Sequence, residues 1–551
     1  MASIVEAPPR LRAPRFQVAQ FLGAHERPLV RVARLAGVAV VVAGVVLRFF
    51  APSALWLDEA LSVNIAKLPL TQIPGALAHD GSPPLYYLLL HFWMVVFGQG
   101  DVAVRALSGV TSVVSLPFFW YAGVRLGGRK VGWATLLLAA SSPFAIYYAT
   151  ETRMYSLMIL LTLLGFLALA RVLEEPSRRR LVALGAVTAA MLYTHYWGLY
   201  LVASVGAWLL YRIWRSSRRP GTETAASARA VRAAFGAMVI GAVCWLPDLP
   251  LFVWQALHTG TPWAGSPDPA DALDTINEFA GSGPWALLLG FWLFAMLALG
   301  VFGRPVRRVG SPGDLRSDGS GGEGRYLVTL DLRTRPEARP VFIALAGTLT
   351  IAVVGGTVAN AAFVARYAAV IFPLFILLCA LGLTVFADRR VATGLLGVAC
   401  LAGILTGVGN NSGQRTQAVQ VAAVLNVQAQ PGDEVVYCPD QLGPAASRLI
   451  HVAGLNQLTF PRAIGPQRVD WVDYRKVIDN TDVGAFAQQM LARLDPGHTL
   501  WFVYNNSYAG LGGDCGYLYN WLNLLRPTGE TVVTADPGKY YESESLVRFA
   551  G

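Results

Sequence analysis

Long apolar segments alternate with short polar connections from residue 31 to residue 408. A helix needs roughly 20 apolar residues to cross a hydrocarbon core of about 30 Å, and most of these segments have that length, although 201–214 is shorter. The pattern predicts an all-α polytopic membrane domain with about 11 transmembrane helices. The predicted segments are 31–50, 104–124, 131–149, 154–172, 181–200, 201–214, 233–254, 285–303, 341–361, 367–387 and 391–408.

The basic residues between these segments fall mostly on one side of the predicted membrane, and the positive-inside rule makes that side the cytoplasm. The rule predicts a cytoplasmic N-terminus over 1–30, a cytoplasmic linker over 304–340 and an exterior location for 409–551. Five cations remain on the outer side: Arg48, Lys67, Arg105, Arg153 and Arg366. An isolated arginine at an outer helix end runs against this bias, so we expect it, more than a loop arginine, to have a specific anionic partner.

The apolar run 84–98 is interpreted differently. If it crossed the membrane, every later arginine cluster would lie outside, against the charge rule. It is also short for a crossing at 1.5 Å per residue. We therefore expect a helix lying in the outer interface, within one long external loop over 51–103.

Beyond residue 409 the pattern changes to short strands and helices. Strands are predicted at 434–437, 499–504 and 545–549, and helices at 445–452, 484–494 and 516–526. This alternation predicts a small extracytoplasmic α/β domain over 409–551. Cys438 and Cys515 both lie in it and can form a disulfide in an oxidising compartment, although spacing does not establish pairing.

Composition agrees with a membrane protein, because 54% of the residues are hydrophobic and only 14% are charged, against about 25% in soluble proteins. The net charge of +10 resides in short loops, so no nucleic-acid partner is expected. Four lysines stand against forty arginines, a usage typical of high-GC bacteria. We therefore expect a multi-pass protein of the bacterial inner membrane.

Acidic residues lie where the first apolar segment ends. Asp58 and Glu59 follow it directly, and His79 and Asp80 come about twenty residues later. Carboxylates at a membrane boundary are costly to desolvate and usually mark chemistry or ion handling. This loop is the strongest candidate for the site of chemistry.

Five segments, in order along residues 30–390, resemble the GT-C superfamily of membrane glycosyltransferases. They are Trp56-Leu57-Asp58-Glu59, Gly81 to Tyr87, Ser142 to Tyr155, Tyr193-Thr194-His195-Tyr196 and Ala365-Arg366-Tyr367. The resemblance is greatest to the branch of protein O-mannosyltransferases and lipid A aminoarabinose transferases. It implies a polyprenyl-phosphate sugar donor, an extracytoplasmic glycan, glycolipid or protein acceptor, membrane lipid as surroundings, and usually inversion at the anomeric carbon.

The resemblance makes Asp58 the general base, since displacement at the anomeric carbon needs a carboxylate to deprotonate the acceptor hydroxyl. Glu59 is the second catalytic acid. Neighbours on a helix point in different directions, so the two roles should differ. The alternative for Asp58 is a residue that favours the helix N-terminus, and Glu59 can also be structural.

The departing lipid phosphate needs cations or other donors. Arg153 and Arg366 can each hold a phosphate through paired hydrogen bonds, and the alternative for Arg153 is a structural pair with Glu151. His79 and Asp80 either position the acceptor, bind a divalent metal ion, or form an ordinary turn. The remaining substrate-binding candidates are Tyr86, Glu151, Tyr155 and His195.

These observations predict a glycosyltransferase of the cell envelope, with mannose as one candidate sugar. No cofactor is required by the sequence, and a divalent metal is left open. The alternative is a lipid or glycan transporter or flippase, whose acids would couple ions, although Asp58 and Glu59 lie in a loop and not mid-span. A membrane-anchored binding protein acting through 409–551 would not need so many spans.

Overall fold

The computed structural model describes residues 28–219, 224–259, 268, 270–304, 329–330, 333–359, 363–508 and 512–551. Most of the predicted cytoplasmic N-terminus and most of the predicted linker lie outside the described residues. The chain divides into two compact units, residues 1–39 and 40–551. In the described part of the first unit, residues 28–39 are the first turns of helix α1 (Pro28–Leu47).

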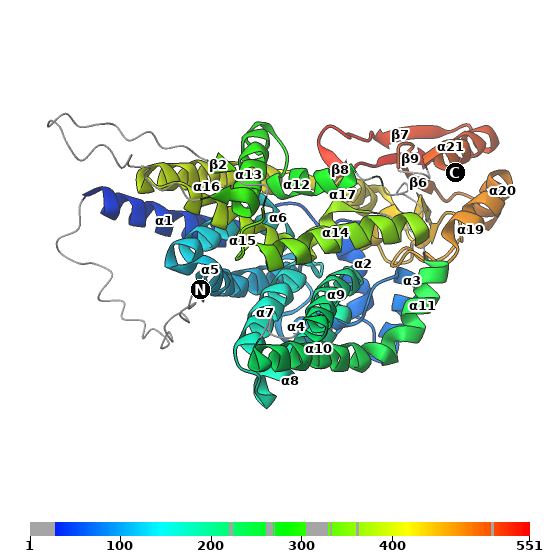
Figure 1. Ribbon diagram of the computed structural model, residues 1–551. Helices are drawn as coiled ribbons and strands as arrows, with labels where there is room; N and C mark the ends of the chain where they lie inside the picture. The colour runs from blue at the N-terminus through cyan, green and yellow to red at the C-terminus, as the bar shows by residue number, and fades with distance from the viewer. Residues whose placement is uncertain are drawn as a thin grey trace, which may run out of the picture. The chain divides into compact units, whose positions relative to one another are not determined.

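The second unit is mostly helical, and Figure 1 shows its helices and the sheet of the C-terminal region. Within the described ranges, seven helical segments are long and apolar enough to cross a membrane. The long helices are α5 (Asp101–Ser141), α7 (Tyr155–Glu174), α8 (Arg178–Leu192), α9 (Trp197–Arg218), α10 (Ala225–Trp245), α13 (Pro284–Phe302), α14 (Arg339–Ala359) and α16 (Arg389–Ser412). The predicted fold class, a polytopic helical domain followed by a small α/β region, is confirmed. The number of crossings and the side on which each end lies stay predictions.

Three predicted segments have different boundaries in the structure. The segment 131–149 is interrupted at Ser142, whose extended backbone and side-chain bond from the Ala145 amide begin a separate helix, α6 (Pro143–Ala149). The predicted break near residue 200 lies instead between Leu192 and Trp197, so α9 is longer than expected. The segment 367–387 begins with a 3-10 turn and continues as α15 (Phe372–Gly382). Each shift leaves a polar connection where a continuous helix was expected.

The predicted external loop contains three short helices, α2 (Leu57–Ala66), α3 (Ile73–Asp80) and α4 (Leu85–Phe97). Helix α4 has 13 residues, about 20 Å at 1.5 Å per residue, which is less than a membrane crossing. Its inner face contributes Tyr86, Tyr87, Leu90 and Met94 to a core that it shares with α2 and α3. The loop is therefore a packed subdomain.

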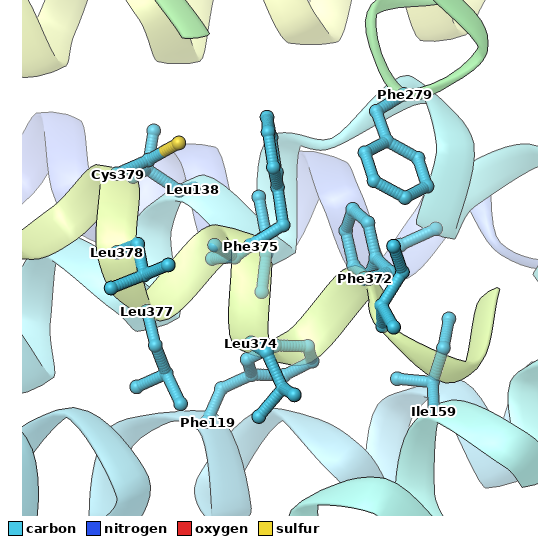
Figure 2. Packing of buried hydrophobic residues seen from close by; sticks show 14 of the residues in the cluster. Phe119, Leu138, Ile159, Phe279, Phe372, Leu374, Phe375, Leu377, Leu378 and Cys379 are labelled. Atoms are coloured by element: carbon cyan, nitrogen blue, oxygen red, sulfur yellow. The ribbon is translucent and has the colours of Figure 1, made fainter. Parts of the chain in front are cut away.

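Helix α15 forms the centre of the helical core, and all of its residues are buried. Phe372 contacts Phe119, Phe144 and Phe279 from three other helices, with ring centroids 5.0–6.1 Å apart. Figure 2 shows this packing. Helices α13 and α15 approach so closely that a Cβ at Gly300 would lie 2.0 Å from the Leu378 carbonyl oxygen, a small-residue contact common between membrane helices.

The C-terminal region has a five-stranded sheet in the order β5-β4-β6-β9-β7. Strand β4 (Glu434–Cys438) pairs in parallel with β5 (Asn456–Thr459) and β6 (Leu500–Tyr504). Strand β9 (Ser545–Phe549) pairs antiparallel with β6 and β7 (Gly529–Val533). The predicted strands agree with β4, β6 and β9, whereas β5 and β7 were not predicted.

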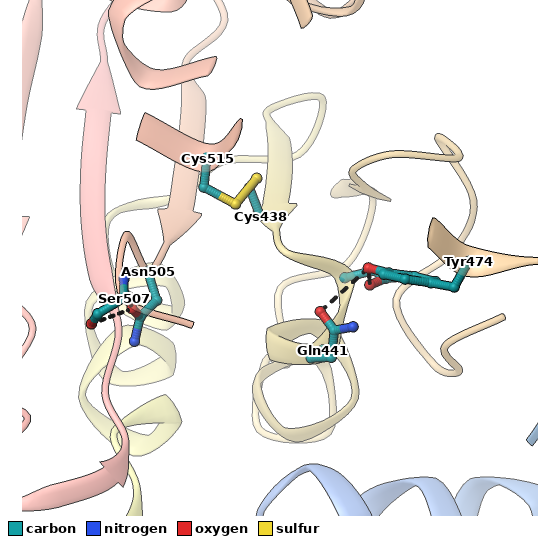
Figure 3. The surroundings of a disulfide bond; sticks show 7 residues. Cys438, Gln441, Tyr474, Asn505, Ser507 and Cys515 are labelled. Atoms are coloured by element: carbon teal, nitrogen blue, oxygen red, sulfur yellow. Dashed lines mark hydrogen bonds between the residues drawn. A yellow bond between two sulfur atoms is a disulfide. The ribbon is translucent and has the colours of Figure 1, made fainter. Parts of the chain in front are cut away.

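Helices α17 (Ala418–Gln428), α19 (Tyr474–Asn480), α20 (Val483–Arg493) and α21 (Gly512–Leu525) belong to the same region. The predicted helix 445–452 is wrong in extent, because α18 spans only Gly443–Ser447. Asn426 bonds the Leu449 carbonyl and the His451 amide, which holds the following residues in a turn. Cys438 and Cys515 form a disulfide between β4 and α21 (Figure 3).

A second, two-stranded sheet joins the two ends of the C-terminal region. Strand β3 (Gln414–Thr416), directly after α16, pairs in parallel with β8 (Tyr540–Glu542). This small sheet carries residues of the C-terminal region to the external loop that contains Asp58 and Glu59.

Candidate functional site

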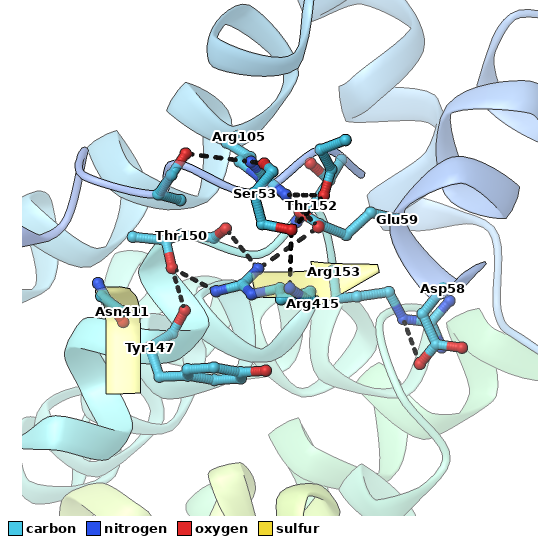
Figure 4. A network of polar contacts seen from close by, with 12 residues as sticks. Ser53, Asp58, Glu59, Arg105, Tyr147, Thr150, Thr152, Arg153, Asn411 and Arg415 are labelled. Atoms are coloured by element: carbon cyan, nitrogen blue, oxygen red, sulfur yellow. Dashed lines mark hydrogen bonds and ion pairs between the residues drawn. The ribbon is translucent and has the colours of Figure 1, made fainter. Parts of the chain in front are cut away.

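Asp58 and Glu59 occupy the first turn of α2, which begins after Trp56 in an extended conformation. Adjacent helical residues project about 100° apart. Figure 4 shows the two carboxylates directed into different surroundings. The expectation that they diverge is therefore met by the geometry.

Glu59 is fully buried in a network of cations. Arg105 donates to both of its oxygens at 2.8 and 2.6 Å, the Thr152 amide donates at 3.0 Å, and Arg415 Nη1 lies 3.4 Å away. Burial alone would raise the pKa of Glu59, but the two guanidinium groups reverse this and the pKa is lowered. Glu59 is an ionised, saturated acceptor with no open side.

The two arginines connect Glu59 to distant segments. Arg105, at the start of α5, also donates to the carbonyls of Ser53 and Ala54 at 2.6 and 3.0 Å. Arg415, on β3, donates to the Thr150 carbonyl and hydroxyl at 2.9 and 2.7 Å. The network therefore fixes α2 relative to α5, the connection after α6 and the C-terminal region. Arg415 was not predicted.

Asp58 has a looser environment. Its Oδ2 lies 3.5 Å from Arg366 Nη2 and 4.0 Å from Arg153 Nε. This oxygen has no hydrogen-bond partner among the residues that the structure describes. Arg153 is held from behind by Ser62 at 3.3 Å and Tyr87 at 3.5 Å. Asp58 is therefore flanked by two guanidinium groups and keeps an unused acceptor.

A cavity of about 600 Å³ lies beside Arg366. Its wall includes Glu151, whose side chain is buried and whose Oε2 lacks a hydrogen-bond partner within the described ranges. Burial raises the pKa of Glu151 to about 7, against the opposing effect of Arg415. Helix α12 (Asp271–Ala280) contributes three polar side chains to another part of the wall: Asp274, Asn277 and Glu278. Tyr148 donates to Glu278 at 2.5 Å and so fixes its carboxylate.

Residues 81–244 of the chain match the model of the dolichyl-phosphate-mannose-protein mannosyltransferase family. No curated protein matches the chain in sequence. The structure is similar to that of ArnT from Cupriavidus metallidurans in the apo state, with a TM-score of 0.55 at 13% identity over 95% of this chain and 99% of ArnT. ArnT bound to undecaprenyl phosphate gives a TM-score of 0.53 at 14% identity, over the same shares. The chain has the GT-C fold.

The family match covers only part of the site of this GT-C chain. It includes Glu151, Arg153, Tyr155 and His195. Asp58 and Arg366 lie outside it and join the site through the tertiary structure. The GT-C fold therefore brings together a matched central segment and residues from both flanks.

Tyr155 and His195 lie side by side, with ring centroids 6.2 Å apart, and His195 also contacts Tyr367 at 4.9 Å. The Tyr155 hydroxyl is buried without a partner in the described part of the chain. Tyr367 follows Arg366, whose guanidinium lies 5.8 Å from its ring. These aromatic residues therefore form a chain of ring contacts that ends at Arg366.

The other candidates lie further from Asp58. His79 is half-exposed and contacts Asp470 of the C-terminal region at 2.7 Å. Asp80 accepts from Tyr87 at 2.7 Å, and Tyr86 bonds Ser108 at 3.1 Å. The sequence grouped these residues with Asp58. Asp80 is linked to Arg153 through Tyr87, and Tyr86 is linked to the Arg153 carbonyl through Ser108. Within the described ranges no group of three His, Cys, Asp or Glu side chains is arranged to hold a metal ion.

The expectation that outer cations have anionic partners holds for Arg105, Arg153 and Arg366 but is wrong for Arg48. The buried Arg48 donates to the carbonyls of Gly44, Ala139 and Ala140 at 2.7–2.8 Å and to Ser112 at 2.9 Å. Carbonyls at the end of a helix carry partial negative charge and can replace a carboxylate.

Proposed function

We propose that the chain transfers a sugar from a polyprenyl-phosphate donor to an acceptor hydroxyl outside the cytoplasm. The observation that carries the proposal is Asp58, an incompletely bonded carboxylate between Arg153 and Arg366. Arg366 also lines the cavity of about 600 Å³. A carboxylate with a free acceptor can take a proton, and guanidinium groups can bind a phosphate.

In the proposed reaction Asp58 accepts the proton of the acceptor hydroxyl. The hydroxyl oxygen forms a bond to the anomeric carbon while the bond from that carbon to the phosphate oxygen breaks. The electron pair leaves with the lipid phosphate, whose charge Arg366 and Arg153 stabilise. Attack opposite the leaving group inverts the anomeric configuration. No atom changes its oxidation state overall, so the reaction needs no oxidant or reductant.

Glu59 has a positioning role in this proposal. Its four polar contacts leave it no acceptor for a substrate proton, and removing a partner from a buried ion pair is strongly destabilising. It therefore holds α2 so that Asp58 faces Arg366. Burial raises the pKa of Glu151 to about 7, so this acid of the cavity wall can change its charge during turnover.

The comparisons support the donor class. The matched family takes its name from dolichyl-phosphate-mannose, and ArnT has been solved with undecaprenyl phosphate. Mannose is therefore the first sugar to test. The disulfide in the C-terminal region supports an exterior location, because such bonds persist in oxidising compartments. A C-terminal alkaline phosphatase fusion should then be active and a fusion at Ser217 inactive, and the reverse pattern would contradict the proposed topology.

The test uses purified full-length protein, a panel of radiolabelled undecaprenyl-phosphate sugars and a bacterial envelope extract. We expect one donor to give labelled product. Arg366→Ala should raise the donor KM about 10- to 100-fold, since bonds to charged groups contribute about 1.5–3 kcal/mol. Arg171→Ala, in the last turn of α7 and away from the cavity, is the matched control. Movement of labelled lipid across a bilayer without sugar transfer by the wild type would instead indicate a flippase.

A further inference from the structure

The small sheet of the C-terminal region contributes Tyr541 to the cavity wall. Tyr541 is the central residue of β8, and its side chain is 77% exposed. Its neighbours Tyr540 and Glu542 are 7% and 1% exposed, because alternate residues of a strand face opposite sides. The ring of Tyr541 is therefore presented to the cavity that Arg366 and Glu151 line.

Trp56 also lines the cavity and contacts Tyr541. The two ring centroids are 5.4 Å apart and the rings stand at 89° to each other. Trp56 is 6% exposed and packs with Trp471 and Tyr474, so its orientation is fixed. Its Nε1 has no hydrogen-bond partner in the described residues, although indole N–H groups usually find one when buried. Trp56 therefore holds the Tyr541 ring edge to face, and its own indole N–H stays an unused hydrogen-bond donor.

Strand β8 is held in place by its pairing with β3. Its residues pair with β3 in register, Tyr540 with Gln414 and Glu542 with Thr416. The buried Glu542 lies near the Leu57 backbone amide at the start of α2. Tyr541 is thus held at a fixed place. It is far from Asp58 and Arg366 in sequence, but it lies within electrostatic reach of both.

We infer that Tyr541, held edge to face against the buried Trp56, forms a platform for a sugar ring of the acceptor, which makes the acceptor a glycan or glycolipid. A pyranose presents an apolar face of C–H groups that packs on aromatic rings, and its hydroxyls match the amide and carboxylates of Asp274, Asn277 and Glu278. An exposed aromatic ring at a fixed position in a polar cavity has this character.

The platform is assigned to the acceptor and not to the donor because of its position in the chain. The donor's lipid must remain in the hydrocarbon, whereas Tyr541 belongs to the polar C-terminal region. Tyr541 also lies within electrostatic reach of Asp58, so a ring on the platform lies near the proposed base. The assignment of this sugar to the acceptor rests on the proposed function. Sugar binding by Tyr541 can be tested without turnover.

The experiment measures binding of a panel of free oligosaccharides (glucose, galactose, mannose and arabinose oligomers) to the purified full-length protein by saturation-transfer NMR. We expect at least one to bind the wild type and Tyr541→Phe, which keeps the ring. Tyr541→Ala should weaken that binding about tenfold, which corresponds to about 1.4 kcal/mol. Tyr517→Ala removes another exposed tyrosine of the same region, on α21, and should have no effect.

Three results would overturn the inference. They are failure of every oligosaccharide to bind the wild type, equal binding by Tyr541→Ala, and loss of undecaprenyl-phosphate binding in Tyr541→Ala, which would move the platform to the donor. Transfer only to Ser- and Thr-containing peptides would likewise replace the glycan by a protein acceptor. Oligosaccharide binding with no sugar transfer from any donor would contradict the proposed function and leave the platform standing.

Discussion

The surroundings of Glu59 and Asp58 differ as much as two neighbouring carboxylates can. Glu59 is enclosed by Arg105, Arg415 and the Thr152 amide, with no exposed surface. Asp58, one residue earlier, has only longer contacts with Arg153 and Arg366 and an unused oxygen. A saturated charge holds structure, whereas an unsaturated charge that contacts Arg366 of the cavity wall can serve a substrate. The comparison assigns stability to one residue and chemistry to the other.

The largest expected effect is on the Glu59 side. Glu59→Gln removes the charge and leaves Arg105 and Arg415 buried without a full partner, which costs about 3–5 kcal/mol. Thermal unfolding of the purified protein should show a large drop in midpoint, whereas Asp58→Asn should unfold close to the wild type. Equal unfolding midpoints for Glu59→Gln and Asp58→Asn would contradict the assignment of a structural role to Glu59 alone.

The second prediction concerns the disulfide of the C-terminal region, because this region supplies Arg415 to the network around Glu59. Peptides with Cys438 and Cys515 should be linked in non-reducing mass spectrometry. Replacing both by serine opens a loop of 77 residues and should cost about 2–5 kcal/mol of stability. Undecaprenyl-phosphate binding at Arg153 and Arg366 should change less than twofold. Two free thiols in the wild type would contradict the pairing.

A smaller effect concerns pH. Burial raises the pKa of Glu151 from 4.5 to about 7, so the folded protein binds more protons than the unfolded chain between these values. This contribution favours the folded state at low pH and is lost as pH rises toward 7, by at most about 3 kcal/mol. Glu151→Gln should remove this dependence from a series of unfolding midpoints at pH 5 to 8. A wild-type curve with the same slope as the variant would assign the dependence to other groups.

The sequence pointed more readily to the residues proposed for chemistry than to the network around Glu59. Asp58, Arg153 and Arg366 became candidates because charges near apolar segments are rare and therefore conspicuous. Arg415 was missed because it lies in a polar region with many arginines, where no local pattern marks it. Its role depends on a contact with Glu59 across 356 positions, which no short window contains.

The elements of the fold also differ in how well the sequence predicted them. Apolar segments located the helices, because burial in a membrane requires a long apolar run whatever the neighbours are. Their ends were less predictable, since Ser142 and Pro143 interrupt an apolar run through local capping. The edge strands β5 and β7 were not predicted because few of their residues are buried and neither strand has a clear alternation. The helix expected at 445–452 ended early because of tertiary bonds from Asn426.

The most direct test of the central claim is sugar transfer by Asp58→Asn beside Glu59→Gln, with the donor that the wild type uses. Loss of a general base typically lowers the rate 10²–10⁴-fold, so Asp58→Asn should lose activity to that extent while folding and donor binding stay near wild type. The activity lost by Glu59→Gln should instead accompany its lost stability and recover in part at lower temperature. Near-normal transfer by well-folded Asp58→Asn would contradict the account.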